Sequence, residues 1–436
     1  MSSNEEYIEQ NRDKDVRQLA LQKMPEGVDA KWVLRQIEGY QLALKKLPRW
    51  AEVAGLHYPP RLSMEQCSSE ATAQYKSALA KRLLSMGYGN NDHEQAATAD
   101  DRKLTATTDG CEQADRADGC GVLVDLTGGF GVDFSYMARP FGKAIYVERQ
   151  EELCQAARHN FPLLGLMQAE VIACSAEEFL DTIDVIDPDN KLCDIAFLDP
   201  ARRDDAGKKT IAISDCTPDL SQLQEQLLSF SRFVIVKLSP MLDITMALRT
   251  LHHVSEVHVV SVKGECKELL FVMTDKVAGR PDYHCVNLGS GESDLILGSE
   301  EIEEARNVSI AASPQPGQYL FEPNASIMKA GMQDAFAASY GLQKLHPMSN
   351  LFIGTEPIAS VPARQFIITG ISDFSKASLK AFLKDIPQAN LTIRNFPSTV
   401  ADLRKRLKIK EGGSVYLFAT TLSDGSHVLI SASKAG

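Results

Sequence analysis

Hydrophobic and polar positions follow two different spacings along the chain. In the first 88 residues the apolar positions have helical spacing, in KWVLRQIEGYQLALKKL before Pro48 and in SSEATAQYKSALAKRLLSM, where Ser68 or Ser69 would be the N-cap. From Gly121, short apolar runs alternate with helix-length segments: VLVDL, AIYVE, VIACS, CDIAFLD, FVIVKLS, VSEVHVVSV and KELLFVM. This alternation predicts a parallel α/β sheet, and the short KGEC between the last two runs predicts an antiparallel pair at its edge.

The remaining segments differ in pattern from this core. EPNASIMKAGMQDAFAASYGL is predicted to form one capped helix, and the strand-like and helix-like runs after residue 350 predict a small α+β domain. The polar, acidic stretch before the glycine-rich strand is predicted to be a flexible linker. The expected organisation is a helical domain at 1–88, a linker at 89–118, an α/β domain at 119–276, a connecting segment at 277–349 and the α+β domain at 350–436.

The amino-acid composition says more about the cellular compartment of the protein than about its function. The 436 residues contain no run of about 18 apolar residues, so we expect no membrane span, and the polar, acidic start does not resemble a signal peptide. Nine scattered cysteines without a C-x-x-C pair and isolated histidines favour reduced thiols and no metal. We expect a cytoplasmic monomer.

Charge is distributed unevenly along the chain. The net charge of −12 argues against an indiscriminate nucleic-acid binder, which normally carries a basic footprint. Between Lys376 and Lys410, however, the chain contains nine Lys and Arg but only two Asp, which gives a local net charge of +7. This segment could contact an anionic partner, or it could be an ordinary solvated helix face.

The stretch VLVDLTGGFGVDFSYMA places three glycines just after the first predicted strand. Glycine has no Cβ, so the chain can turn sharply there and approach a ligand closely, at the edge where open α/β sheets bind ligands. A dinucleotide fingerprint needs a glycine or alanine where Phe134 stands, and the G-K-[ST] of a Walker A loop is absent. Both of those cofactor classes are disfavoured, and a tight turn without a ligand remains an alternative.

The same stretch resembles the S-adenosyl-L-methionine (AdoMet) loop of class I methyltransferases, in which an acid ends the strand before the glycines. Glu148, at the end of AIYVE, stands where such enzymes hold the ribose hydroxyls, and Ser175 begins the segment that contacts adenine. In several RNA methyltransferases, a polar segment before the glycine-rich strand folds over the methionine end of AdoMet, and the resemblance implies a cofactor contact for Ser69 in this segment. An ordinary N-cap role explains Ser69 equally well. The cofactor contacts implied by the resemblance are Asp125, Thr127, Gly128, Gly129, Gly131, Asp133, Glu148, Arg149, Ser175, Ala176, Glu177 and Ser69.

CDIAFLDPARRD places Asp199-Pro200-Ala201-Arg202 at the carboxyl end of the fourth strand, beside the first. It resembles the [D/N/S]-P-P-[F/Y/W] motif of amino-group methyltransferases, in which the acid or amide side chain and the proline carbonyl accept hydrogen bonds from an exocyclic NH₂. The resemblance implies that Asp199, Pro200 and Arg202 are catalytic, although Ala201 replaces the second proline and Arg202 replaces the stacking aromatic. C5-uridine methyltransferases share D-P-x-R but need a cysteine after the fifth strand, where Ser239 stands. A structural turn with an exposed basic pair is the alternative.

Polar residues at the same edge of the sheet are candidates for substrate binding. KLSPMLD puts Lys237 and Ser239 at the end of the fifth strand, and GECKELL puts Glu265, Lys267 and Glu268 in the turn between the sixth and seventh. A helix start at Ser239 and an ordinary charged turn are the alternatives. With the basic residues near the fourth strand and in the C-terminal segment, the candidates are Arg203, Lys237, Ser239, Lys267, Arg404, Lys405 and Arg406.

Taken together, these motifs and FPSTVADLRKRLKIKEGGSVYLFATTL resemble a bacterial family of class I AdoMet-dependent methyltransferases with a THUMP-like C-terminal domain. The resemblance implies an α/β, Rossmann-like methyltransferase core, made of a parallel sheet with an antiparallel last strand. An N-terminal helical region and a small α+β C-terminal domain flank this core. The resemblance also implies methylation of an exocyclic amine of a base in RNA, either tRNA or rRNA. A methyltransferase for a small molecule or a protein, and a non-catalytic AdoMet-binding module, remain alternatives.

Overall fold

The computed structural model describes residues 3–88, 121–183, 191–202, 213, 216–277, 279–289, 291, 293–305, 308–311 and 313–435. The predicted linker at 89–118 and Arg203 therefore lie outside the described residues. These residues divide into two compact units, one made of 3–256 with 268–277 and the other of 257–267 with 279–435, each with the gaps just given. Within the described ranges, no helix is both long enough and apolar enough to cross a membrane.

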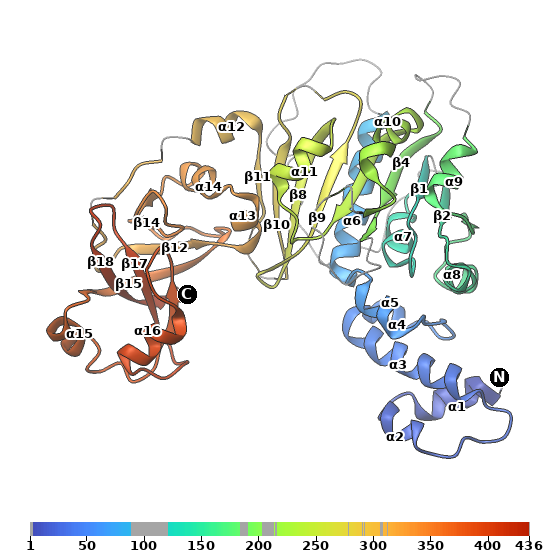
Figure 1. Cartoon of the computed structure of the whole chain (residues 1–436), viewed down its shortest axis with the longest axis horizontal. Helices are drawn as coiled ribbons and strands as arrows, with labels where there is room; N and C mark the ends of the chain where they lie inside the picture. The colour runs from blue at the N-terminus through green and yellow to red at the C-terminus, as the bar shows by residue number, and fades with distance from the viewer. Residues whose placement is uncertain are drawn as a thin grey trace. The chain divides into compact units, whose positions relative to one another are not determined.

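The chain begins with helices, as the apolar spacing predicts (Figure 1). Pro48 separates the third helix from the fourth, because proline cannot continue a helix but fits its first turn. Phe130, in the glycine loop of the α/β core, packs against Trp50 with 4.9 Å between ring centroids, so the helices and the core share one hydrophobic cluster. The helices are α1 (Ser3–Asn11), α2 (Val16–Ala20), α3 (Ala30–Lys46), α4 (Pro48–Ala51), α5 (Arg61–Gln66) and α6 (Glu70–Tyr88).

The α/β core contains all seven strands predicted from the apolar runs. They are β1 (Val122–Asp125), β2 (Lys143–Val147), β3 (Ala169–Ile172), β4 (Cys193–Leu198), β7 (Ser231–Leu238), β8 (Val254–Val262) and β9 (Glu265–Met273). Strands β1, β2, β3, β4 and β7 pair in parallel, and β9 is antiparallel to β7. With β10 (Asp282–Leu288) and β11 (Leu295–Leu297), the sheet has the order β11-β10-β8-β9-β7-β4-β1-β2-β3. The prediction of a parallel sheet with an antiparallel last strand is confirmed.

The carboxyl ends of the parallel strands meet at one edge of this sheet. The chain reverses direction through helices after each parallel strand, so the ends of β1, β2, β3, β4 and β7 meet at one edge. The helices are α7 (Val132–Met137), α8 (Glu151–Leu163), α9 (Ala176–Asp181), α10 (Leu220–Phe230) and α11 (Ile244–Thr250). A two-stranded ribbon, β5 (Ala201–Arg202) with β6 (Cys216–Thr217), follows β4.

The second unit is built on a seven-stranded sheet in the order β13-β14-β12-β15-β18-β17-β16. Residues that alternate along its strands enter two separate hydrophobic clusters, and α15 and α16 contribute to only one of them, so these two helices cover one face. Its elements are α12 (Ser299–Glu304), β12 (Tyr319–Pro323), α13 (Ala325–Ala330), α14 (Gln333–Ser339), β13 (Gln343–Lys344), β14 (Phe352–Gly354), β15 (Ala363–Asp373), α15 (Lys376–Phe382), β16 (Asn390–Ile393), α16 (Val400–Leu407), β17 (Val415–Thr421) and β18 (His427–Lys434).

One predicted helix is wrong in this unit. The single helix expected in EPNASIMKAGMQDAFAASYGL is two helices, α13 and α14. Gly331 ends α13 in the left-handed conformation, with φ of 74°, and its N–H bonds to the carbonyl of Ile327. Glycine adopts this conformation without a Cβ penalty, so it terminates the first helix despite the continuous apolar spacing.

Candidate active site

A cavity of about 590 Å³ opens at the carboxyl edge of the parallel strands, within the first unit. Its walls come from the loops after β1, β2, β3 and β4, from the end of β7, and from the segment that joins α5 to α6. This is the position at which open α/β sheets hold their ligands. The volume lies in the range of sites that enclose a cofactor-sized molecule.

The glycine loop shapes one wall of the cavity. Gly129 and Gly131 have φ of 56° and 81°, conformations that side chains other than glycine rarely adopt. Gly128 is required for space, since a Cβ added there would lie 2.1 Å from the Cε2 atom of Tyr146. The Tyr146 hydroxyl donates a hydrogen bond to the carbonyl of Gly129. Tyr146, on β2, therefore packs against the glycine loop and is also hydrogen-bonded to it.

Glu148 closes the same wall from the end of β2. One carboxylate oxygen accepts the N–H of Gly129 at 2.9 Å, and the other accepts the N–H of Gln150 at 2.8 Å. These bonds leave further lone pairs on both oxygens, because a carboxylate offers about four acceptor sites. The side chain is buried yet lines the cavity, which suits a carboxylate that accepts ligand hydroxyls.

The end of β4 lies beside the end of β1 at the cavity. The N–H of Asp199 donates to the Thr127 hydroxyl at 2.6 Å, so the loops after these neighbouring strands are tied together. The Asp199 side chain remains 40% exposed, whereas Asp125, at the end of β1, is buried with an oxygen accepting the N–H of Thr127. Of these two carboxylates, Asp199 is the more accessible to an incoming group.

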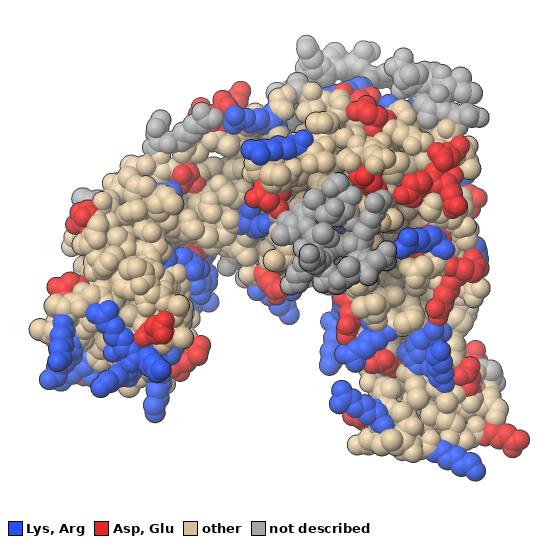
Figure 2. Space-filling view, viewed as in Figure 1, with Lys and Arg blue, Asp and Glu red and all other residues tan. Residues whose placement is uncertain are grey.

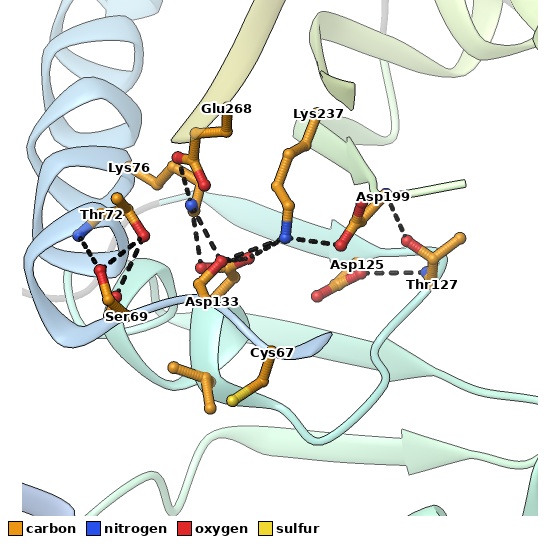
Figure 3. Close-up of polar contacts among 12 residues, drawn as sticks. Cys67, Ser69, Thr72, Lys76, Asp125, Thr127, Asp133, Asp199, Lys237 and Glu268 are labelled. Carbon is orange, nitrogen blue, oxygen red and sulfur yellow. Dashed lines mark hydrogen bonds and ion pairs between the residues drawn. The ribbon is translucent and has the colours of Figure 1, made fainter. Parts of the chain in front are cut away.

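Two lysines, the buried Lys76 and the partly buried Lys237, neutralise carboxylates on this side of the cavity (Figure 3). Lys237, on β7, places its ammonium 2.5 Å from an oxygen of Asp199 and 3.2 Å from an oxygen of Asp133. Lys76, on α6, lies 3.2 Å from the other oxygen of Asp133 and 2.5 Å from Glu268 on β9. Four structural elements therefore contribute charges to one cluster beside Asp199.

The cluster changes the protonation of its members. Burial by itself would raise the pKa of the Asp133 carboxyl, but the ammonium groups of Lys237 and Lys76 outweigh it and hold the pKa at about 2. Burial would lower the pKa of Lys237, but Asp133 and Asp199 outweigh it and raise the pKa well above its ordinary range. Asp133 is therefore an anion and Lys237 a cation at neutral pH. Burial also raises the pKa of the Asp125 carboxyl well above its ordinary range.

Most of the predicted site residues lie in this cavity. The predicted residues that line it are Asp125, Thr127, Gly128, Gly129, Gly131, Asp133, Glu148, Arg149, Ser175, Ala176, Glu177, Asp199, Pro200 and Lys237. Ser175 also caps α9 in a reciprocal capping box with Glu178, so part of its role is structural. Ser175 nevertheless lines the cavity, together with Ala176 and Glu177.

The other predicted residues lie elsewhere or have a different role. Ser69 does not line the cavity; its hydroxyl accepts the N–H of Thr72 and caps α6, whereas the neighbouring Ser68 lines the cavity. Ser239 bonds to the N–H of Met241 at the start of the turn after β7, also outside the cavity lining. Lys267 and the basic residues of α16 belong to the second unit, and Lys267 pairs with Glu265 at 2.7 Å. Arg202 lies on β5.

Sequence reasoning missed Lys76 and mistook the setting of Glu268. Glu268 is not in a turn: it lies inside β9, 4% exposed. Lys76 is fully buried, and a signal for it exists, because Ala73, Lys76, Ala80 and Leu83 form one stripe at helical spacing and all are buried. A lysine on an otherwise apolar stripe predicts a buried carboxylate partner, since lysine is almost never fully buried unpaired.

The order β3-β2-β1-β4-β7-β9-β8 within the sheet, with β9 antiparallel and the glycine loop after β1, defines the chain as a class I AdoMet-dependent methyltransferase. A comparison with known proteins supports the same class. The chain is 24% identical over 307 residues to an uncharacterised S-adenosylmethionine-dependent methyltransferase of Mycobacterium tuberculosis, covering 70% of this chain and 78% of that protein.

The C-terminal part and the whole chain identify the family. Residues 363–434 match a THUMP domain-like family, and residues 319–362 match a ferredoxin-like domain. A crystal structure from Porphyromonas gingivalis W83, provisionally described as a methyltransferase, is 32% identical with a TM-score of 0.79, covering 100% of this chain and 98% of that one. The chain belongs to this family of AdoMet-dependent methyltransferases with a THUMP-like C-terminal domain, as the sequence motifs predict. Its cofactor is S-adenosylmethionine.

Proposed function

We propose that the protein methylates an exocyclic amine of a base in RNA, either tRNA or rRNA, and that Asp199 and Pro200 orient this amine. Glu148 would accept the ribose hydroxyls of AdoMet, the glycine loop would pass beneath its amino-acid part, and Ser175 to Glu177 would contact its adenine. AdoMet supplies an electrophilic methyl group. The residues of the chain then need only to hold a nucleophile in line with it, which can contribute about 7–11 kcal/mol when fully realised.

The observation that supports an amine acceptor is the balance of donors and acceptors at Asp199. The three ammonium hydrogens of Lys237 face three acceptors, on Asp199, Asp133 and Ser68, so none is left for a substrate. The N–H of Asp199 is bonded to Thr127, and Pro200 has no N–H. What this edge offers is acceptors: the second oxygen of Asp199 and the carbonyl of Pro200. Such an edge suits an NH₂ group, which donates two hydrogen bonds.

The support for RNA comes from the second unit. Residues 363–434 resemble THUMP domains, and blue side chains gather over α15 and α16 in Figure 2. The exposed cations of these helices and the loops that follow are Lys376, Lys380, Lys384, Lys405, Arg406, Lys408 and Lys410. Arg404 bonds to the carbonyl of Ala389 at 3.2 Å, so it is partly engaged within the domain. A cluster of exposed cations is the feature that contacts a phosphate backbone.

The first experiment is a transfer assay with tritiated AdoMet. The acceptors are total RNA, tRNA and rRNA from cells that lack the gene, and boiled protein is the blank. We expect label in one RNA class, lost by at least a hundredfold in Asp199→Ala and kept in Asp181→Ala, which removes an exposed acid on α9. Label only in protein or small molecules would overturn the RNA substrate. Full activity of Asp199→Ala would overturn the role of Asp199.

A binding assay tests the basic surface separately. Arg404→Glu, Lys405→Glu and Arg406→Glu together should weaken binding to the labelled RNA at least tenfold and reduce the slope of affinity against salt. The matched control is Lys14→Glu, Arg17→Glu and Lys23→Glu, an equal change of charge in and around α2. Equal affinity of the two triple variants would remove α16 from the RNA interface.

A further inference from the structure

Lys76 is the most deeply buried charge of the described residues around the cavity, with 0% exposure. Its ammonium donates hydrogen bonds to Glu268 at 2.5 Å and to the Ser68 hydroxyl at 3.2 Å, and it forms an ion pair with an oxygen of Asp133 at 3.2 Å (Figure 3). All three of these contacts lie inside the protein. Lys76 does not line the cavity and cannot touch a ligand there.

Two of the three groups that Lys76 contacts, Asp133 and Ser68, also contact Lys237, which does reach the cavity. The Ser68 hydroxyl donates to Asp133 at 2.7 Å and accepts from both lysines, at 3.2 Å from Lys76 and 3.1 Å from Lys237. Asp133 faces Lys76 with one oxygen and Lys237 with the other. Each lysine thus fixes Asp133 and Ser68, which the other lysine also contacts. Lys237 connects this cluster to Asp199.

We propose that Lys76 is a positioning residue for methyl transfer, which holds Asp133 and Ser68 so that Lys237 is fixed against Asp199. The proposal rests on the role assigned above to Asp199. It extends the active site to α6, a helix that precedes the α/β core in sequence and contributes no catalytic group of its own.

Charge balance explains why Lys76 matters at a distance. Two lysines face three carboxylates, those of Asp133, Glu268 and Asp199. Without Lys76, two buried carboxylates compete with Asp199 for the single cation left, Lys237. Lys237 is then drawn toward the interior, because a buried carboxylate without a cation is far more costly than one at the cavity mouth. Asp199 loses its fixed orientation, and a displacement of about 1 Å at a reacting group can cost about a hundredfold in rate.

The experiment separates positioning from simple neutralisation of Glu268. Lys76→Met removes the cation, and Lys76→Met with Glu268→Leu removes the cation together with its closest anion, which keeps the fold free of an unpaired charge. We expect kcat at saturating AdoMet and RNA to fall about tenfold to a hundredfold in both variants, with a smaller change in the Kd for AdoMet. Wild-type kcat in the double variant would overturn the proposal, since Lys76 would then serve only to neutralise Glu268.

The matched control is another ion pair on the same helix. Arg82, also on α6, bonds to Glu256 on β8 at 3.0 Å, and neither residue lines the cavity. Arg82→Met with Glu256→Leu should leave kcat at the wild-type value. A loss as large as that of the Lys76 double variant would mean that any disturbance of α6 impairs catalysis, which also overturns a specific role for Lys76.

A crystal structure of the Lys76 double variant gives a readout that does not depend on the substrate. The separation of the Lys237 ammonium from the Asp199 carboxylate, 2.5 Å in the wild-type protein, should increase beyond hydrogen-bond range. An unchanged separation would overturn the proposal whatever the substrate is. Absence of methyl transfer to RNA by the wild-type protein would instead overturn the proposed function and leave this measurement to decide the role of Lys76.

Discussion

The two sides of the cavity hold their polar groups by different physical means. On the cofactor side, at the ends of β1 and β2, backbone N–H groups meet one carboxylate, Glu148, and the tight fit of Gly128 against Tyr146 sets the shape. On the transfer side, at the ends of β4 and β7, two lysines and three carboxylates balance one another around Asp199. Backbone geometry positions the first side, and charge compensation positions the second.

The difference predicts which substitutions alter affinity and which alter rate. Groups held by the backbone keep their place when a neighbouring side chain changes, so under the proposed function a change there would remove one contact with AdoMet. Groups held by balanced charges move together, because removing one member leaves another uncompensated in a buried place. Substitutions on the transfer side should therefore affect kcat more than the Kd for AdoMet, and those on the cofactor side should do the reverse.

The largest expected effect is that of Lys237→Met. It removes the cation that contacts Asp199 directly, so kcat should fall about a hundredfold or more, while the Kd for AdoMet changes less. Single-turnover transfer of a tritiated methyl group, with calorimetry for the Kd, measures both. Equal losses in kcat and in affinity would break the distinction between the two sides, since Lys237 would then act in binding AdoMet.

Acid stability provides the next test, because Asp133 and Asp125 should respond with opposite signs. The pKa of Asp133 is lowered to about 2, so its contribution to the free energy of unfolding is present above pH 4 and is lost as the pH falls from 4 to 2. The pKa shift corresponds to on the order of 2 kcal/mol. The pKa of Asp125 is raised by burial, so wild-type stability relative to Asp125→Asn should fall as the pH rises above 4.

Urea unfolding of the wild type, Asp133→Asn and Asp125→Asn at several pH values measures both signs. The advantage of wild type over Asp133→Asn should shrink toward pH 2, and its advantage over Asp125→Asn should shrink toward neutral pH. Parallel curves for the two variants would mean that the lysines do not distinguish Asp133 from Asp125.

The same distinction decides how much of the site could be predicted from the sequence. The strands, the glycine loop, Glu148 and Asp199 follow from patterns that lie within a few residues of each other, and each has a recognisable local cause. The charge cluster has none: Lys76 and Glu268 are 192 positions apart, and Lys237 and Ser68 are 169 apart. Only the buried stripe of α6 hints at a partner for Lys76, and it does not say which carboxylate.

One alternative that the sequence left open and one wrong helix have local causes. Ser68 and Ser69 are adjacent and chemically identical, so the pattern cannot say which caps the helix and which faces the cavity. The structure gives the cap to Ser69, whose hydroxyl reaches the N–H three residues on. In the second unit, Gly331 divides an otherwise continuous helical pattern, because its left-handed backbone overrides the apolar spacing.

The smallest expected effect, and the sharpest for the cofactor side, is that of Glu148→Gln. The amide keeps the shape, and its oxygen can still accept the N–H of Gly129, so the glycine loop should stay in place, although its NH₂ group cannot accept the N–H of Gln150. What is lost is a charged acceptor for ligand hydroxyls, and we expect the Kd for AdoMet to rise about tenfold, equivalent to about 1.4 kcal/mol, with kcat at saturating AdoMet unchanged. Glu151→Gln, an exposed acid in the first turn of α8, is the control that should change neither quantity. If Glu148→Gln lowers kcat and leaves the Kd as it was, the carboxylate acts on the transfer side, and the division between affinity and rate fails at the residue where it should be clearest.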